Sequence, residues 1–211
     1  MGLAHQAGDT YTIADAAWHT GATLVRDEYP NDALKHFQLG DFWASKATSG
    51  AGDPRLPTLI AWLRLNSATA YALMGGIDEA TRYLAKAHNG WEPRDAFERA
   101  AMDRATAAIH LDLGQLDTAK QLAASALRTY GEDHRRGRIM AELLLAEVHV
   151  RAGESQGLIL ARHAIAGVST LQSVDVRRQR LIPLTVALEA RPSTDTRELA
   201  RMARQVAATR V

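Results

Sequence analysis

Short apolar stretches at helical spacing, each ended by a polar break, repeat along most of the chain. Three passages have the same pattern: YALMGGIDEA at 71–80, HLDLGQLDTA at 110–119 and HVRAGESQGL at 149–158. In each, an apolar run is followed by a glycine, and a second run begins two or three residues later. A glycine at the end of a helix favours a left-handed cap that other residues adopt at a cost. Each passage therefore predicts two helices joined by a tight turn.

The spacing of these turns predicts a repeat. Gly75, Gly114 and Gly153 are each separated by 39 residues. A fixed period of this size is typical of arrays in which each hairpin buries its apolar face against the next one. We therefore predict an all-α fold with about nine to eleven helices in antiparallel pairs and essentially no β-strand.

The two ends of the chain carry weaker copies of the pattern. Near the N-terminal end, DEYPND forms the turn, and Pro30 suits the first turn of the helix that follows. Near the C-terminal end, segments 173–190 and 195–208 can form a last pair, although Pro183 should kink or divide the first of them. Ser193, with Asp195 and Glu198 after it, is typical of a helix start.

We interpret the chain as one helical-repeat domain over residues 1–211. The predicted hairpins cover about 10–47, 57–90, 93–130 and 133–171, and the terminal helices lie within 173–208. The segment TSGAGDPRLP (48–57) is expected to be a loop, because its two glycines and two prolines cannot all continue a helix.

The hairpins resemble tetratricopeptide repeats, a family in which small residues occupy the close crossing between the two helices of each hairpin. The second, third and fourth hairpins carry the matching positions, which are Ala68, Tyr71, Gly75, Ala80, Leu84 and Ala87, then Ala107, His110, Gly114, Ala119, Ala123 and Ala126, then Ala146, His149, Gly153, Leu158, Arg162 and Ile165. The first hairpin matches more weakly, with Gly21 at the close-packed position and Phe37 on its second helix. Leu158 replaces the usual small residue, so we expect a looser crossing in the fourth hairpin. The resemblance implies TPR-like hairpins stacked into a short superhelix, an α-solenoid.

Within this superfamily, the alanine- and arginine-rich style resembles the C-terminal repeat regions of actinobacterial helix-turn-helix transcriptional regulators. That resemblance implies a bacterial regulatory module that binds a protein or peptide, with nucleic acid reached only indirectly through a regulator. The residues ahead of Asp9 are too few for a DNA-binding domain. We therefore expect either a stand-alone relative or the sensing part of a longer regulator. A homodimer is left open.

Composition excludes several classes of protein. Hydrophobic residues make up 46% and charged residues 23% of the chain, which is typical of a folded protein rather than a disordered one. The absence of cysteine excludes disulfides, thiolate metal sites and cysteine nucleophiles. No apolar run approaches the roughly 20 residues that span a bilayer. Residues 1–9 lack the pattern of a secretory signal, so we expect a cytoplasmic protein without membrane contact.

No motif indicates catalysis. None of the eight histidines forms an HExxH arrangement, and His110 and His149, at equivalent repeat positions, are interpreted as packing residues with a polar tip. The acidic pairs at 27–28, 78–79 and 132–133 fall at predicted turns or helix starts, where backbone N–H groups favour them. The chain has no GxSxG elbow, P-loop or GxGxxG sequence. We therefore expect no enzyme activity, no metal and no cofactor.

The inner face of the expected superhelix is the predicted ligand site, because the first helix of each hairpin lines it. The inward positions chosen as binding-groove residues are Trp18, Arg26, Trp62, Asn66, Thr69, Arg104, Asp112, Glu147 and Arg151. Aromatic residues and arginine are the types enriched at binding hot spots. The lysine and asparagine clamp of chaperone-binding relatives is absent at the matching positions, so binding of chaperone tails is not expected.

Trp62, Asn66, Thr69 and Arg104 are predicted to be the centre of this groove, with Arg104 binding a carboxylate through two parallel hydrogen bonds. The alternative for Trp18 and Trp62 is a place in the core of long helices.

A second interpretation is nucleic-acid binding through the C-terminal half. Residues 131–211 carry 13 Lys/Arg against 9 Asp/Glu, whereas residues 1–130 carry 12 against 15. The clusters HRRGR (134–138) and RRQR (177–180), with Arg197, Arg201 and Arg204, motivate this interpretation. Against it, Tyr130 is the only aromatic residue beyond position 100 that could stack on a base.

Overall fold

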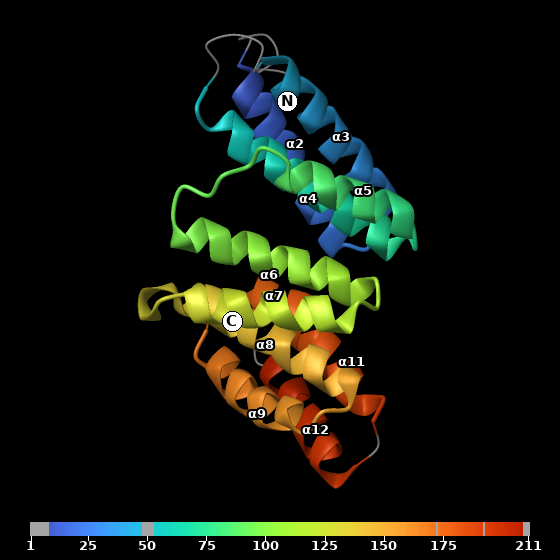
Figure 1. Cartoon of the computed structure of the whole chain (residues 1–211). Coiled ribbons are helices and arrows are strands. Elements are labelled where there is room, and N and C mark those ends of the chain that lie inside the picture. The colour runs from blue at the N-terminus through green and yellow to red at the C-terminus, as the bar shows by residue number, and fades with distance from the viewer. Residues whose placement is uncertain (1–8, 48–52, 172, 192, 209–211) are drawn as a thin grey trace. The chain divides into compact units, whose positions relative to one another are not determined.

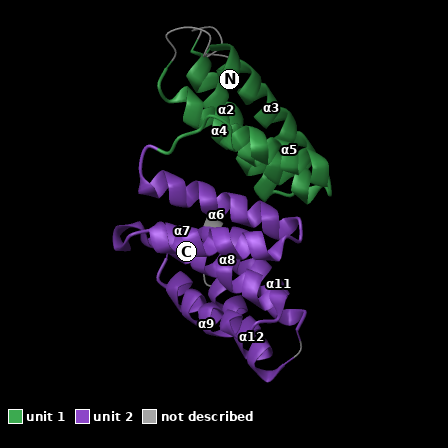
Figure 2. Cartoon of the chain, in the orientation of Figure 1, with its two compact units in different colours: residues 1–93 green, residues 94–211 purple. Residues whose placement is uncertain are grey.

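The computed structural model describes residues 9–47, 53–171, 173–191 and 193–208 (Figure 1). Within these ranges every regular element is helical, so the predicted all-α fold without strands is confirmed for this part of the chain. Ten α-helices longer than one turn are present there, within the predicted number. The chain consists of two compact units, residues 1–93 and 94–211 (Figure 2).

Unit 1 contains two helical hairpins. Helices α2 (Thr10–Arg26) and α3 (Pro30–Ala47) form the first, and α4 (Leu56–Leu73) and α5 (Ile77–His88) form the second. Pro30 begins α3, as expected from its fixed φ. Gly21 lies against the ring of Phe37, where a Cβ at residue 21 would come within 2.4 Å of the ring. This contact holds α2 and α3 at the close crossing that the sequence indicated for Gly21.

The predicted loop at 48–57 is shorter in the structure than in the prediction. Residues 48–52 lie outside the described residues, and Pro54 and Arg55 form a turn. Leu56 begins α4, so Pro57 lies in the first turn of a helix rather than in a loop. A proline is accommodated there because the first helical N–H groups have no intrahelical partner.

The turn glycines have the predicted left-handed backbone. The φ angles are +77° at Gly75, +75° at Gly114 and +80° at Gly153. Each glycine follows the first helix of its hairpin, and its N–H and that of the next residue bond to carbonyls in the last turn of that helix. The prediction that these three glycines end their helices is confirmed.

Glu28 occupies the equivalent position in the first hairpin. It follows Gly21 by seven residues, as Gly75 follows Ala68, and its φ of +68° is the only positive value of a non-glycine residue within the described ranges. A side chain in this conformation brings Cβ close to the following carbonyl oxygen, which is unfavourable by about 1–2 kcal/mol. The turn geometry is therefore kept even where the sequence does not supply glycine.

Unit 2 consists of two further hairpins and a terminal group of helices. The hairpins are α6 (Ala96–Asp112) with α7 (Leu116–Thr129), and α8 (Arg135–Ala152) with α9 (Gln156–Ser169). A single 3-10 turn, η1 (Glu132–His134), precedes α8. The terminal group comprises α10 (Val174–Val176), the π-helical turn η2 (Arg177–Leu181), α11 (Ile182–Glu189) and α12 (Thr194–Ala208). Ser193 caps α12 by accepting from the N–H of Thr196 at 3.1 Å, as its sequence context indicated.

Helix α8 is the central helix of unit 2. All residues from Ile139 to Val150 are buried except His149, and the helix packs against α6, α7, α9 and α11. A helix that is apolar on every side is typical of such a position. Two acidic residues, Glu142 and Glu147, lie within this buried run. A buried charge is unfavourable without partners, so these two carboxylates need compensating groups around them.

The predicted helix 173–190 stays helical from Val174 to Glu189 and is not divided at Pro183, but its hydrogen bonding changes there. Proline has no N–H for the carbonyl four residues earlier, and its ring crowds that carbonyl. In the structure α11 begins at Ile182, with Pro183 in its first turn, and the wider turn η2 precedes it. The N–H of Ile182 bonds to the carbonyl of Arg177, five residues back. Single π turns inside α-helices are frequent at functional sites.

The expectation of a looser crossing at Leu158 is wrong. The buried positions of α9 begin with Gly157 and continue at Ala161 and Ala164. They have the spacing that Ala119, Ala123 and Ala126 have on α7, but they come one residue earlier than the 39-residue period predicts. A Cβ on Gly157 would lie 2.7 Å from the backbone nitrogen of Val150, so this crossing is close. Leu158 is half-buried and Arg162 is exposed, because Gly157, and not Leu158, lies at the close crossing.

Candidate functional site

The predicted groove residues are divided between the two units. Trp18, Arg26, Trp62, Asn66 and Thr69 belong to unit 1, on α2 and α4, and the other four belong to unit 2. Trp18 packs against the core of unit 1, and its indole Nε1 has no hydrogen-bond partner among the described groups. Arg26 donates to Thr23 Oγ1 at 2.9 Å. The predicted grouping of Trp62, Asn66 and Thr69 with Arg104 stays a prediction.

The polar groups on α4 bond to their own helix. Asn66 Nδ2 donates to the carbonyl of Trp62 at 2.8 Å, and Thr69 Oγ1 donates to that of Leu65 at 3.2 Å. Both side chains and that of Trp62 are half-buried. Such bonds to the preceding turn occupy a donor that a ligand would otherwise take.

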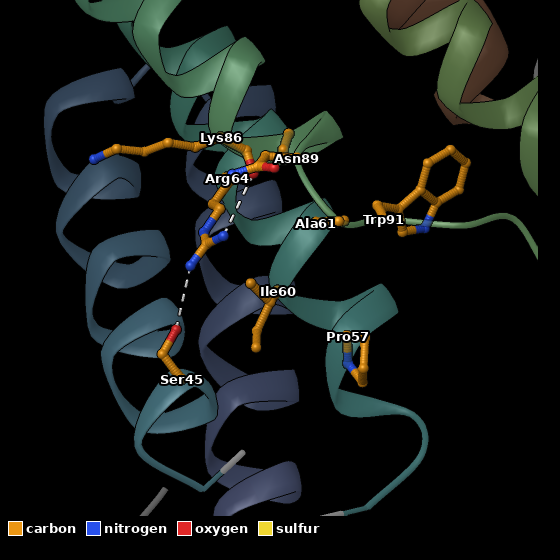
Figure 3. Close-up of a pocket in the computed structure, with 10 residues that line it drawn as sticks. Ser45, Pro57, Ile60, Ala61, Arg64, Lys86, Asn89 and Trp91 are labelled. Atoms are coloured by element: carbon orange, nitrogen blue, oxygen red, sulfur yellow. Dashed lines mark hydrogen bonds between the residues drawn. The ribbon is translucent and has the colours of Figure 1, made fainter. Parts of the chain in front are cut away.

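A cavity of about 320 Å³ lies in unit 1, beside the C-terminal end of α5 (Figure 3). Arg64 on α4 is its main charged wall. Its Nε donates to both carboxylate oxygens of Asp41, and its Nη atoms reach Ser45 Oγ and the carbonyl of Lys86, both at 3.4 Å. Figure 3 shows the last two bonds converging on the guanidinium. Because Arg64 is already surrounded by acceptors, we interpret it as a residue that joins α3, α4 and α5.

A second cavity, of about 500 Å³, lies in unit 2 between the α8–α9 turn and the α11–α12 turn. Its two charged residues also have partners. Glu154 accepts from Lys120 Nζ at 2.8 Å, and Arg191 Nη2 donates to the carbonyl of Arg151 at 2.7 Å. Both cavities are therefore walled by polar groups that already serve the packing of helices.

The strongest candidate is a group of five charged side chains in unit 2. Arg104 and Asp112 come from α6, two turns apart on one face of that helix, and Glu147 and Arg151 come from α8, one turn apart. These four are the groove residues predicted for this part of the chain. Arg180, from the π turn η2, is the fifth. The charge of Arg180 acts on Asp112 and Glu147, and the charges of Arg104 and Arg151 act on Arg180. We call these five residues the charged cluster.

Hydrogen bonds within the charged cluster are incomplete. Arg151 Nη2 donates to Glu147 Oε1 at 2.6 Å. The Glu147 side chain is only 1% exposed. Its other carboxylate oxygen, Oε2, is buried and has no hydrogen-bond partner among the described groups. The Nε atoms of Arg104 and Arg180 are likewise buried without a described partner. Unpaired buried polar atoms are unfavourable, and a water molecule or a group of a ligand can satisfy them.

The protein around the cluster changes the proton affinity of three members. Burial raises the pKa of Glu147, against the opposing effect of Arg180 and Arg151. Burial also raises the pKa of Asp112, although that side chain keeps an exposed face. For Arg180, burial and then the charge of Arg104 lower the pKa, but a guanidinium starts so high that it stays charged at neutral pH. Titratable groups whose pKa values are shifted by burial and by neighbouring charges are often found at functional sites.

Arg180 is the member that the sequence pattern did not place in the groove. Arg180 belongs to the segment RRQR (177–180), which is expected from the sequence to form part of an exposed basic surface. In the structure Arg177 is only 8% exposed and Arg180 is half-buried. Elsewhere in this half, Arg204 pairs with Glu189 at 2.5 Å and Arg162 with Glu198 at 3.5 Å. No signal in the sequence indicated the inward direction, because it depends on how η2 packs against other helices.

Two histidines, His110 and His149, bond to turn residues of their own hairpins. His110 and His149 each bond through Nδ1 to the residue that follows the turn glycine of their own hairpin, Gln115 and Glu154 respectively. They stabilise turns, which refines the prediction of a packing residue with a polar tip. Within the described residues, no group of three or more His, Asp or Glu side chains could hold a metal ion.

No helix in the described ranges is both long enough and apolar enough to cross a membrane. Comparisons with models of protein families, with characterised proteins and with solved structures found no match for this chain. Function is therefore inferred from the geometry of the charged cluster.

Proposed function

We propose that this chain is a TPR-like helical-repeat module that binds a peptide or protein partner, and that the charged cluster of unit 2 is part of the binding surface. Three findings support the repeat assignment: consecutive hairpins, turn glycines 39 residues apart, and a left-handed residue at each of those glycines. The stacking of all hairpins into one superhelix is part of the proposal.

The incomplete hydrogen bonding of the charged cluster is the observation that supports the proposed binding function. Side chains from α6, α8 and η2 gather at one place, and three buried polar atoms there have no described partner. A purely structural cluster would be expected to satisfy its own hydrogen bonds, because each unpaired buried group is unfavourable by about 1–3 kcal/mol. A partner that supplies acceptors and donors would remove that cost.

Regulation is the biological role that this module would serve. A peptide-binding surface on the sensing part of a bacterial transcriptional regulator, or on a stand-alone relative, agrees with the resemblance stated above. A helix-turn-helix coding segment directly upstream or next to the gene would support this role. A neighbouring secretion or transport gene would instead support a scaffold role.

The direct test is selection of peptides on the full chain. The purified chain is immobilised and used to enrich a displayed library of random peptides, and the enriched peptides are then measured by calorimetry. We expect saturable binding that is lost when Arg104, Glu147 and Arg151 are replaced together. If no sequence is enriched above an unrelated helical protein, the proposal of a peptide-binding module fails.

Direct nucleic-acid binding is the competing function, and burial of Arg177 and half-burial of Arg180 weaken it. A salt-sensitive shift of labelled DNA at moderate protein concentration would favour it, since counterion release makes such binding fall steeply with salt. No shift at low salt would remove it.

A further inference from the structure

The charged cluster has more positive groups than negative ones. It contains three guanidinium groups, on Arg104, Arg151 and Arg180, and two carboxylates, on Asp112 and Glu147. With both carboxylates ionised, the cluster carries one positive charge in excess. Arg151 and Glu147 are joined by an ion pair, which leaves Asp112 to face the charges of Arg180 and Arg151.

Arg104 and Arg180 are the two members that lack a carboxylate of their own. The Nε–H of each is buried and has no hydrogen-bond partner in the described part of the chain. Their like charges repel, and this repulsion lowers the pKa of Arg180. Two guanidinium groups whose charges act on each other are stabilised when an anion lies between them, because each can donate charge-assisted hydrogen bonds to it.

We propose that a single carboxylate of the partner, from an acidic side chain or a chain terminus, binds between Arg104 and Arg180. This proposal rests on the proposed peptide-binding function and names the chemical group that the site recognises. A carboxylate supplies one negative charge, which matches the excess of the cluster. A phosphate dianion brings a second charge toward Asp112 and Glu147 and is disfavoured by that repulsion.

Proton uptake accompanies this binding. The charged groups that act on Glu147 are Arg180, Arg151 and Asp112, and those that act on Asp112 are Arg180 and Arg151. Adding a carboxylate beside them raises the pKa of both acidic groups further, because like charges disfavour ionisation. Binding therefore strengthens as pH falls toward those raised pKa values, while a peptide carboxylate, with a pKa of about 3.5, stays ionised.

The test uses the full chain and three simple anions, which need no knowledge of the natural partner. Spectra that correlate the ¹H and ¹⁵N nuclei of arginine Nε–H groups are recorded during titration with sodium acetate, inorganic phosphate or sodium chloride at constant ionic strength. The Arg104→Gln and Arg180→Gln variants identify the two resonances. Arg99→Gln, on the exposed side of α6, is the matched control.

We expect acetate to shift the Nε–H resonances of Arg104 and Arg180 with one saturating curve, and chloride to have no such effect. Arg104→Gln should weaken acetate binding at least tenfold, and Arg99→Gln should leave it unchanged. Acetate should bind more tightly as pH is lowered toward the raised pKa values of Asp112 and Glu147. If Arg180→Gln does not fold, the wild-type titration and Arg104→Gln still decide the result.

Three results would overturn the proposal: unmoved resonances, equal shifts with chloride, or tighter binding of phosphate than of acetate at pH 8. The outcomes separate the two proposals. Selected peptides that bind without moving these resonances would retain the peptide-binding function and remove the carboxylate site. Acetate binding without any selected peptide would retain the anion site and remove the peptide-binding module.

Discussion

Glu147 accepts a hydrogen bond from Arg151 Nη2 on one carboxylate oxygen, at 2.6 Å, and its other oxygen is buried without a described partner. The two residues are one helical turn apart on α8, so the ion pair is local, yet the carboxylate is 1% exposed while the arginine side chain is 41% exposed. The pair thus places a negative charge inside unit 2 and its counter-charge nearer to water. This asymmetry explains why burial raises the pKa of Glu147 despite an adjacent guanidinium.

The first prediction concerns the pH dependence of stability. Folding raises the pKa of Glu147 above its ordinary value of 4.5, so the folded chain binds this proton more tightly than the unfolded chain. The resulting stabilisation is fully present below pH 4.5 and is lost as pH rises through the raised pKa. The loss amounts to about 1.4 kcal/mol for each pH unit that separates the folded and unfolded pKa values.

Glu147→Gln should remove this pH-dependent loss, because the amide does not ionise. Urea unfolding between about pH 4.5 and 8 is the measurement, with the exposed Glu132→Gln as control. Parallel curves for wild type and Glu147→Gln would contradict the prediction.

The second prediction concerns Arg104. Arg104→Ala should weaken an acidic or C-terminal peptide ligand by about 2 kcal/mol or more, because a buried charged hydrogen bond is lost. Stability should change little, since Arg104 Nε has no described partner and its charge repels Arg180. Calorimetry of a selected peptide and thermal unfolding are compared with Arg99→Ala on the same helix. A strongly lowered melting temperature with unchanged affinity would make Arg104 a structural residue and remove the site assignment.

The third prediction concerns the turn after α6. Gly114→Ala should lower the free energy of unfolding by about 1 kcal/mol, because φ is +75° there. Gly131→Ala is the matched control. A Cβ would meet nothing within 4 Å at either position, but Gly131 has an ordinary φ of −70°. Denaturant unfolding should separate the two variants; equal effects would mean that backbone conformation does not limit this turn.

The fourth prediction makes the opposite change at the equivalent turn of the first hairpin, where a left-handed residue is replaced by glycine. Glu28→Gly should raise the free energy of unfolding by about 0.5–1 kcal/mol, since relief of the left-handed strain exceeds the entropy that glycine loses on folding. Glu28 is exposed, so little packing is lost. Glu28→Ala keeps the Cβ and should give no gain. A gain with alanine equal to that with glycine would assign the effect to the side chain instead of the backbone.

The fifth prediction concerns the contact between Gly21 and Phe37. Gly21→Ala places a Cβ within 2.4 Å of the buried Phe37 ring, which should be unfavourable by about 1–3 kcal/mol. Phe37→Leu makes room, so the double variant should lose less stability than the two single variants together. Strict additivity in the unfolding measurements would show that the two side chains do not share this space.

The local structure could be predicted well because it depends on short-range chemistry. The turn at Gly114 requires a residue that adopts positive φ, and glycine does so without steric cost. Pro183 disturbs a helix wherever it stands in one, because it lacks the N–H. The position of Arg104 four residues before Ala108, and of Glu147 four residues before Arg151, fixes which side chains share a helix face.

The alignment of the repeat was predicted less well. A 39-residue period cannot indicate that the close crossing of α8 and α9 lies at Gly157, one residue before the position that Leu158 holds in the repeat. That shift depends on which small residue lets the backbones of α8 and α9 approach, and this is a property of the packed pair. Glu28 likewise gave no sequence signal for its left-handed backbone, because glutamate rarely adopts it.

The sequence by itself determined the helical hairpins, their turns and the face on which Arg104, Asp112, Glu147 and Arg151 lie. The tertiary structure alone decided that Arg180 joins them, since the π turn beside Pro183 comes from a distant segment of the chain. It also decided the electrostatics. Proton affinity depends on how much water is removed and which charges are near, and both are set only when α6, α8 and η2 pack together.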